Sequence, residues 1–237
     1  MKVLAIESSA VAASIAVAED NQLICEYTTN YKKTHSQTLM PMIEEVCNMI
    51  NLDLDELDVI AVSKGPGSFT GLRIGVATAK GLAHTLEIPI AGINTLDALA
   101  YNIGYTDRII CPLMDARRNQ VYTGLYSYNG NDFINILPST VVPIEEIIIE
   151  IKKLSRQVIF LGDGVAPNID AIKNNFTHEE YVLAPLNNNV QRASSVAALG
   201  ILYGTKGKTE SYMNFKPIYL RKSQAEREYE RKHNTCI

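Results

Sequence analysis

One order of predicted elements occurs twice along this chain of 237 residues. Each time, three short apolar runs separated by polar turns come first, and helical and extended apolar patterns then alternate. Strands are predicted at 3–6, 13–18, 22–27, 59–63, 90–93, 109–114, 120–128, 133–137, 158–161 and 181–184. Helices are predicted at 34–50, 69–86, 95–101, 144–154, 167–175 and 194–203. The sequence therefore predicts an α/β protein built from two similar halves.

Three antiparallel strands that lead into two strand–helix crossovers are the arrangement of a ribonuclease-H-like half-domain. In duplicate, this order is the architecture of the actin, sugar-kinase and heat-shock ATPase superfamily. We place the first predicted domain at residues 1–103, including a glycine-rich helix. The second, reduced domain is predicted at residues 104–237, with a charged tail.

Charge and cysteine content narrow the function classes. Acidic residues outnumber basic ones by 26 to 22, so the net charge of −4 disfavours a stand-alone nucleic-acid-binding protein. The four cysteines are widely spaced and form no Cys-x-x-Cys pair, which favours a reducing cytoplasm over an oxidising compartment. The longest apolar stretches are too short to span a bilayer, so no membrane association is expected.

The loop at 64–68 and the helix after it are the most informative segment. Lys64 precedes the glycines, so the spacing is not that of a P-loop. In the helix after this loop, every fourth residue is small: Gly71, Gly75, Ala79 and Ala83. A helix face without large side chains is buried well only against a closely fitting partner. That partner is either the predicted helix at 34–50 of the same chain or a helix of another subunit. The residues of the two first-half helices assigned to a partner interface are Leu39, Ile43, Val46, Ile50, Gly71, Leu72, Arg73, Gly75 and Ala79.

Several segments resemble the TsaB (YeaZ) family, namely 3–9, 35–43, 64–81, 114–118, 121–126 and 219–221. The resemblance implies a partner subunit of the bacterial machinery that makes threonylcarbamoyladenosine beside the tRNA anticodon. The implied partners are the catalytic paralogue TsaD, the ATPase TsaE through the complex, and a second copy of this chain when TsaD is absent. Contact with tRNA is expected only through the complex.

The same resemblance offers a test for catalysis. In TsaD-like proteins an Asn-His-x-x-Gly-His segment supplies two histidine ligands to a metal ion, and here Thr95 and Leu99 occupy those positions. Neither side chain replaces an imidazole ligand. We therefore expect no catalytic residue, no metal and no enzyme activity. A metal-dependent glycoprotease-like hydrolase is the alternative, and stoichiometric bound zinc or iron would support it.

Nucleotide binding is the remaining question. The superfamily uses two hairpin turns, one in each half, and the first here contains Ser8 and Ser9, whose hydroxyls are the candidate phosphate contacts. The second turn, at 115–118, lacks glycine and contains Arg117 and Arg118, which would crowd a close backbone approach. No bound cofactor is therefore expected. A weak ATP-binding actin-like protein remains a further alternative.

Overall fold

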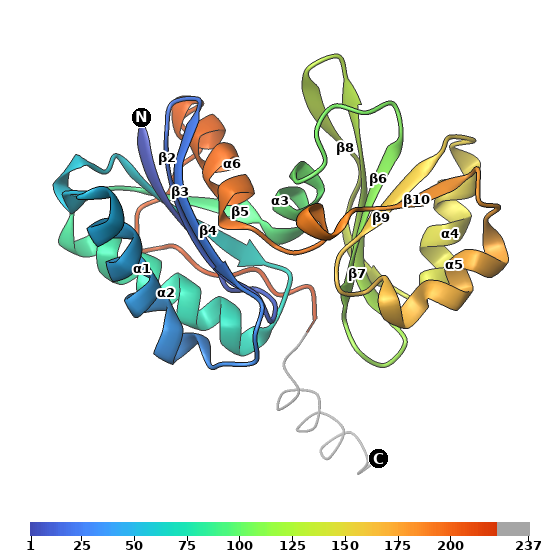
Figure 1. Ribbon diagram of the computed structural model, residues 1–237, viewed down its shortest axis with the longest axis horizontal. Coiled ribbons are helices and arrows are strands. Elements are labelled where there is room, and N and C mark those ends of the chain that lie inside the picture. Colours follow the sequence, from blue (N-terminus) through green and yellow to red (C-terminus); the bar gives the residue numbers. More distant parts are fainter. Residues whose placement is uncertain (222–237) are drawn as a thin grey trace, which may run out of the picture.

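The computed structural model describes residues 1–221 and contains two five-stranded mixed sheets (Figure 1). Their strand orders are β3-β2-β1-β4-β5 and β8-β7-β6-β9-β10. Each sheet joins an antiparallel three-strand meander to two parallel strands. The two halves thus have the same topology, and the doubled element order predicted from the sequence is confirmed.

The first sheet is covered on both faces, which is why its central strands are almost continuously apolar. Its strands are β1 (Lys2–Glu7), β2 (Ala13–Glu19), β3 (Gln22–Thr29), β4 (Val59–Gly65) and β5 (Ile90–Asn94). Helices α1 (His35–Ile50) and α2 (Phe69–Thr85) pack on one face. Helices α3 (Thr95–Tyr101) and α6 (Ala193–Thr205) pack on the other.

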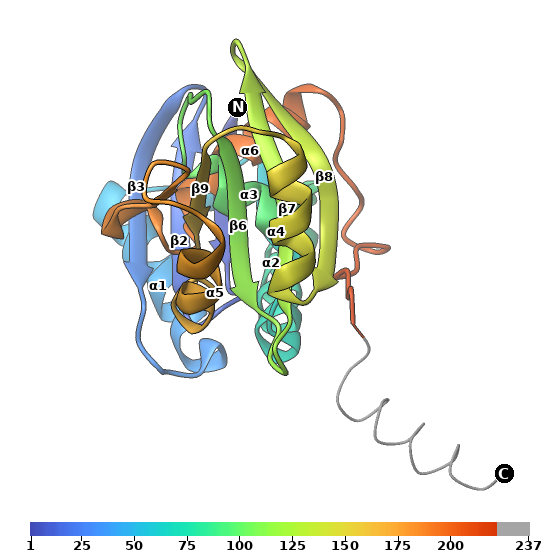
Figure 2. The same ribbon diagram turned by 90° about the vertical axis from the view of Figure 1, so that its right-hand side faces the viewer.

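The second sheet packs helices on its outer face and faces α3 with its inner face (Figures 1 and 2). Its strands are β6 (Ile109–Asp115), β7 (Val121–Asn129), β8 (Asp132–Val142), β9 (Val158–Leu161) and β10 (Tyr181–Leu183). The outer helices are α4 (Ile144–Lys153) and α5 (Ile169–Asn175). Short 3-10 helices occur at Leu54–Glu56, Ala166–Asn168 and Leu186–Asn188.

Strand β8 is longer than the sequence predicts. The predicted strand ends at Leu137, directly before Pro138, whose nitrogen cannot donate a ladder hydrogen bond. The strand continues to Val142 because it lies at the edge of the sheet, where a proline amide needs no partner. The pairing with β7 shifts register between Thr123 and Leu125, so a bulge accommodates the proline.

The C-terminal part of the chain returns to the first sheet. Helix α6 follows the second half in sequence but packs against β1, β2, β4 and β5. Residues 211–221, which we call the strap, then run along α2 (Figure 1). The expected boundary at residue 103 separates the strands of the two sheets, whereas residues 193–221 belong by packing with the first half. Among the described residues, no helix has the length and apolar character needed to span a membrane.

Candidate functional site

The first hairpin turn is buried beneath the start of α2. The Ser8 hydroxyl donates to the Gly71 carbonyl oxygen at 2.9 Å, and the Ser9 carbonyl accepts from the Ser68 amide at 2.6 Å. A Cβ placed on Gly71 would lie 2.1 Å from the Ser8 carbonyl oxygen, and one on Gly75 would lie 2.2 Å from the Ser8 hydroxyl. The small-residue face of α2 therefore packs against this turn, and both serine side chains lie inside the chain.

A carboxylate that the sequence did not single out organises this turn. Glu7 is fully buried and accepts from the Ser9 amide at 2.7 Å and from the Ser63 hydroxyl. His35 reaches the same turn, with its Nε2 2.8 Å from the Ala10 carbonyl oxygen. Burial raises the pKa of Glu7, and the hydrogen bonds from Ser63 and Ser9 oppose that rise. The Ser9 hydroxyl, one of the two predicted phosphate contacts, also donates to the Glu7 carboxylate.

The second hairpin turn, between β6 and β7, is exposed and unusual in its backbone. Arg117, Arg118 and Asn119 all have positive φ, between 57° and 61°. Asp115 lies at the end of β6, and its amide donates to the Asp163 carboxylate at 3.3 Å. Burial raises the pKa of Asp163, and the Asp115 carboxylate adds to that rise. The turn that contains the two arginines therefore begins beside two carboxylates, those of Asp115 and Asp163.

The two positions expected to replace metal-binding histidines lie in the core. Asn94 caps α3 by accepting from the amides of Leu96 and Asp97 at 2.9 and 3.3 Å. Thr95 and Leu99 of this helix are fully buried. Among the described residues, no group of three or more His, Cys, Asp or Glu side chains is placed to hold a metal ion.

Helix α3 fills the space between the two halves with apolar side chains. Its inner face joins the second sheet in one buried cluster, formed by Leu96, Leu99, Ala100, Ile103, Ile110, Met114, Tyr126, Ile159 and Leu161. The Tyr126 hydroxyl donates to the Asp97 carboxylate at 2.8 Å, and burial raises the pKa of both groups. The halves therefore share a core along α3.

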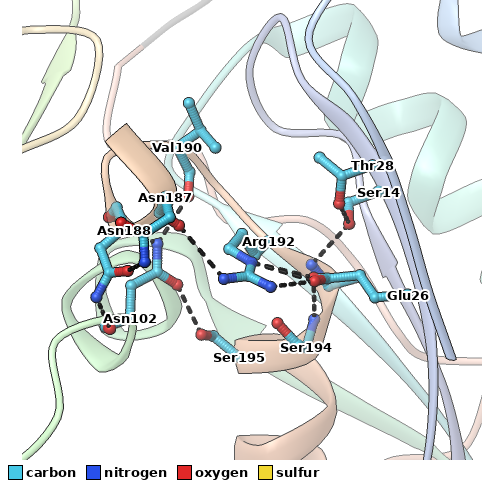
Figure 3. Close-up of polar contacts among 11 residues, drawn as sticks. Ser14, Glu26, Thr28, Asn102, Asn187, Asn188, Val190, Arg192, Ser194 and Ser195 are labelled. Carbon is cyan, nitrogen blue, oxygen red and sulfur yellow. Dashed lines mark hydrogen bonds and ion pairs between the residues drawn. The ribbon is translucent and has the colours of Figure 1, made fainter. Parts of the chain in front are cut away.

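A polar cluster braces the start of α6 against the first sheet (Figure 3). Arg192 donates from Nε to the Glu26 carboxylate at 3.1 Å, and the Ser194 amide donates to the same carboxylate at 3.0 Å. The Ala193 amide donates to the Ser14 hydroxyl at 3.0 Å. Two unpaired amides at the N-terminus of the helix are thus satisfied by side chains of β2 and β3.

Asn102, directly after α3, ties the loop that precedes α6 to the rest of the cluster (Figure 3). Its side-chain amide donates to the carbonyl oxygens of Asn188 and Val190 at 3.1 and 2.7 Å. Its side-chain carbonyl accepts from the Ser195 hydroxyl at 2.6 Å. The chain segment that crosses from the second sheet back to the first is therefore held in place by hydrogen bonds.

The contribution of Glu26 to stability is expected to depend on pH. Burial by itself raises the pKa of Glu26, but hydrogen bonds from Arg192 and Ser194 outweigh it and hold the pKa below the ordinary value of 4.5. Because the folded-state pKa is the lower one, the stabilisation is complete above the unfolded pKa and is lost as pH falls through the folded pKa.

Glu26→Gln should therefore lower the free energy of unfolding by about 2 kcal/mol at neutral pH, and by clearly less at about pH 3. Urea unfolding of both proteins at each pH measures the difference. Glu44→Gln, an exposed change on α1, is the matched control and should show no such trend. An equal difference for Glu26→Gln at both pH values would contradict the assignment.

The nine residues assigned to a partner interface are mostly in the chain's own core. Seven of them are buried against the first sheet or the turn beneath α2, namely Leu39, Ile43, Val46, Gly71, Leu72, Gly75 and Ala79. Ile50 is half-buried, and Arg73 is exposed. The apolar stripe of each helix faces the sheet because a mixed sheet of this kind needs a helical layer on both faces. The exposed surface of the helix pair is therefore formed by Arg73 and by residues outside this set.

Arg73 has neighbours that the sequence analysis did not connect with it. Its guanidinium carbon lies 3.9 Å from the centre of the Phe69 ring, and its Nε donates to the Tyr219 hydroxyl at 3.1 Å. Tyr219 lies in the segment 219–221, which resembles the TsaB family but contains no pattern that predicts a contact with α2. No local pattern links it to α2, because the two positions are 146 residues apart.

The fold and these sites define the class of protein. It has a duplicated ribonuclease-H-like fold, in which an apolar core joins the two halves. The structure superimposes on a ROK hexokinase from Thermus thermophilus with a TM-score of 0.50 at 12% identity, over 86% of this chain and 100% of that one. This likeness concerns the fold alone.

The chain belongs to the TsaB family. It is 35% identical over 226 residues to the tRNA threonylcarbamoyladenosine biosynthesis protein TsaB of Bacillus subtilis, covering 95% of this chain and 96% of that protein. Residues 22–229 match the family model described as TsaD, tRNA N6-adenosine threonylcarbamoyltransferase. YeaZ from Pseudomonas aeruginosa has the same fold, with a TM-score of 0.80 at 23% identity over 92% of this chain and 99% of that one.

Proposed function

We propose that this chain is a non-catalytic partner subunit in the synthesis of threonylcarbamoyladenosine in tRNA. In this role it supports a TsaD-type subunit, which transfers the threonylcarbamoyl group to N6 of the adenosine next to the anticodon. The observation that carries the proposal is the pair Thr95 and Leu99, which stand where the catalytic paralogue has metal-binding histidines and which are fully buried. A Cβ on Gly162 would lie 3.0 Å from a Leu99 methyl carbon, so Leu99 packs tightly against the second half.

The exposed side of α1 and α2 is the surface that best suits a helical partner. Met40 and Met49 of α1 are 52% and 63% exposed, and methionine adapts well to a partner surface. Arg73, Ala77 and Gly81 are exposed along α2 at four-residue spacing. Small side chains at two of these positions let a second helix approach closely. Two such helix pairs, one from each subunit, would complete a four-helix bundle.

The other partners follow from the same role. The TsaE-type ATPase would join through the complex, tRNA would be contacted indirectly, and a second copy of this chain would occupy the helix face when the TsaD-type subunit is absent. The compartment is the reducing cytoplasm. The three cysteines among the described residues are all free, and burial raises the pKa of Cys111 to about 12, which keeps its thiol protonated.

Reconstitution tests the proposal directly. TsaD-type and TsaE-type subunits, the enzyme that makes threonylcarbamoyl-AMP, and unmodified tRNA from the same organism are combined with or without this chain. We expect modification to fall to background without it, as measured by mass spectrometry of digested nucleosides. A TsaD-type subunit lacking its metal-binding histidines is the control and should give no product even with this chain present. Full modification without this chain, or product with the inactivated subunit, would contradict the proposal.

A further inference from the structure

Arg73 lies on a surface that two distant segments build together. The rings of Phe69, at the start of α2, and Tyr219, in the strap, have centroids 4.7 Å apart. The Arg73 guanidinium covers the Phe69 ring and donates through Nε to the Tyr219 hydroxyl. We call these three residues the Arg73 platform. Stacking and a directed hydrogen bond together restrict the guanidinium to one orientation.

The strap holds Tyr219 firmly in place. Phe215 is only 1% exposed and packs over Gly92, where a Cβ would lie 2.5 Å from the phenylalanine ring. The Ile218 amide donates to the Lys64 carbonyl oxygen at 2.6 Å. Lys80 of α2 donates to the Phe215 carbonyl oxygen at 3.2 Å. The platform is therefore a rigid surface, although its tyrosine follows every helix and strand of residues 1–221.

The charge of the platform has no counterpart in the described part of the chain. Within residues 1–221, Arg73 forms no ion pair, and its only hydrogen bond is the one to Tyr219. Its terminal amino groups are therefore available for a ligand. The first turn of α2 contains no acidic residue, so the positive end of the helix dipole adds to the local positive potential.

We propose that Arg73 is the anchor of the partner interface and that it pairs with a carboxylate on the partner protein. This inference rests on the proposed function and names the chemistry of its docking surface. A guanidinium bonded through Nε keeps its terminal amino groups for a planar oxyanion. Arginine is also enriched among residues that dominate interface energies, and here its orientation is fixed before binding.

A carboxylate on a protein fits this surface better than an RNA phosphate. Arg73 is followed along the exposed side of α2 by Ala77 and Gly81, and uncharged small residues suit a helix rather than a phosphate backbone. The net charge of −4 also opposes RNA binding by this chain. The partner class is therefore a protein helix that presents Asp or Glu.

Calorimetric titration against the purified TsaD-type subunit of the same organism tests the inference. Arg73→Lys keeps the charge but loses the planar fork, and we expect binding to weaken about tenfold or more. Tyr219→Phe removes only the orienting hydroxyl and should weaken binding about fivefold. In the double variant, Tyr219→Phe should add little, because the hydroxyl acts through Arg73. Arg108→Lys, in the second half, is the matched control and should bind like the wild type.

The outcomes separate this inference from the proposed function. If the wild type binds and Arg73→Lys binds equally well, or if the two single effects simply add, the inference is overturned while the subunit role stands. If Arg73→Lys weakens tRNA binding and leaves the protein partner unaffected, the ligand is a phosphate and the inference is also overturned. Absence of binding by the wild type would overturn both. Melting temperatures of all variants are compared to verify that each is folded.

Discussion

Gly71→Ala is expected to destabilise the protein by about 3 kcal/mol, although alanine favours helices more than glycine does. The added methyl group would lie 2.1 Å from the Ser8 carbonyl oxygen, which is backbone and cannot rotate away. The turn and the start of α2 would have to separate. Separation would break the hydrogen bond from Ser8 to Gly71 and expose the buried Glu7 beside it.

Gly81→Ala on the same helix is the matched control for this change. Gly81 is exposed, and a Cβ there would meet nothing within 4 Å. Removing backbone freedom at an unstrained helical position should stabilise the protein by about 0.5–1 kcal/mol. Thermal and urea unfolding of both variants provide the comparison. Equal stability of Gly71→Ala and the wild type would show that the turn does not pack on α2 as described.

Phe215→Ala is expected to cost about 3–5 kcal/mol of stability, which is a large effect for a residue that lies outside the helices and strands of residues 1–221. The ring lies among apolar residues of α2 and the first sheet, directly over Gly92. Truncation would leave a cavity. It would also weaken the hydrogen bonds that join the strap to Lys64 and Lys80.

Met213→Ala is a suitable control because it lies in the same strap but is 69% exposed. It should change the free energy of unfolding by less than about 0.5 kcal/mol. Urea unfolding at neutral pH measures both effects. If Phe215→Ala were as stable as Met213→Ala, the strap would contribute nothing to the fold and could not hold Tyr219 for Arg73.

Most of the fold could be predicted because local patterns are strong in this chain. Alternating apolar runs and helical stripes placed every strand and every α-helix of the described residues within a few positions, apart from the end of β8. Strand β8 continues through Pro138 because a proline is tolerated at a sheet edge, and edge position depends on how the whole sheet is ordered.

The candidate sites were harder to predict, and their residues show why. Gly71 and Gly75 were expected to pack against the helix at 34–50 or against another subunit, but their nearest neighbour is the Ser8 turn. Arg73 was predicted to lie at an interface, but its contacts with Phe69 and Tyr219 were not predicted. Contacts between residues far apart in sequence leave no periodic signal in a single chain.

The amino-acid sequence by itself determined the elements, their doubled order and the side of each helix that is apolar. All of these depend on side-chain type and spacing over a few turns. Only the tertiary structure decided what covers each apolar face: the sheet beneath α1 and α2, the second half beyond α3, and the strap beside Arg73. The hydrophobic effect depends on the apolar area removed from water and not on which surface covers it. The sequence of one helix therefore predicts its apolar face but not the structure that buries this face.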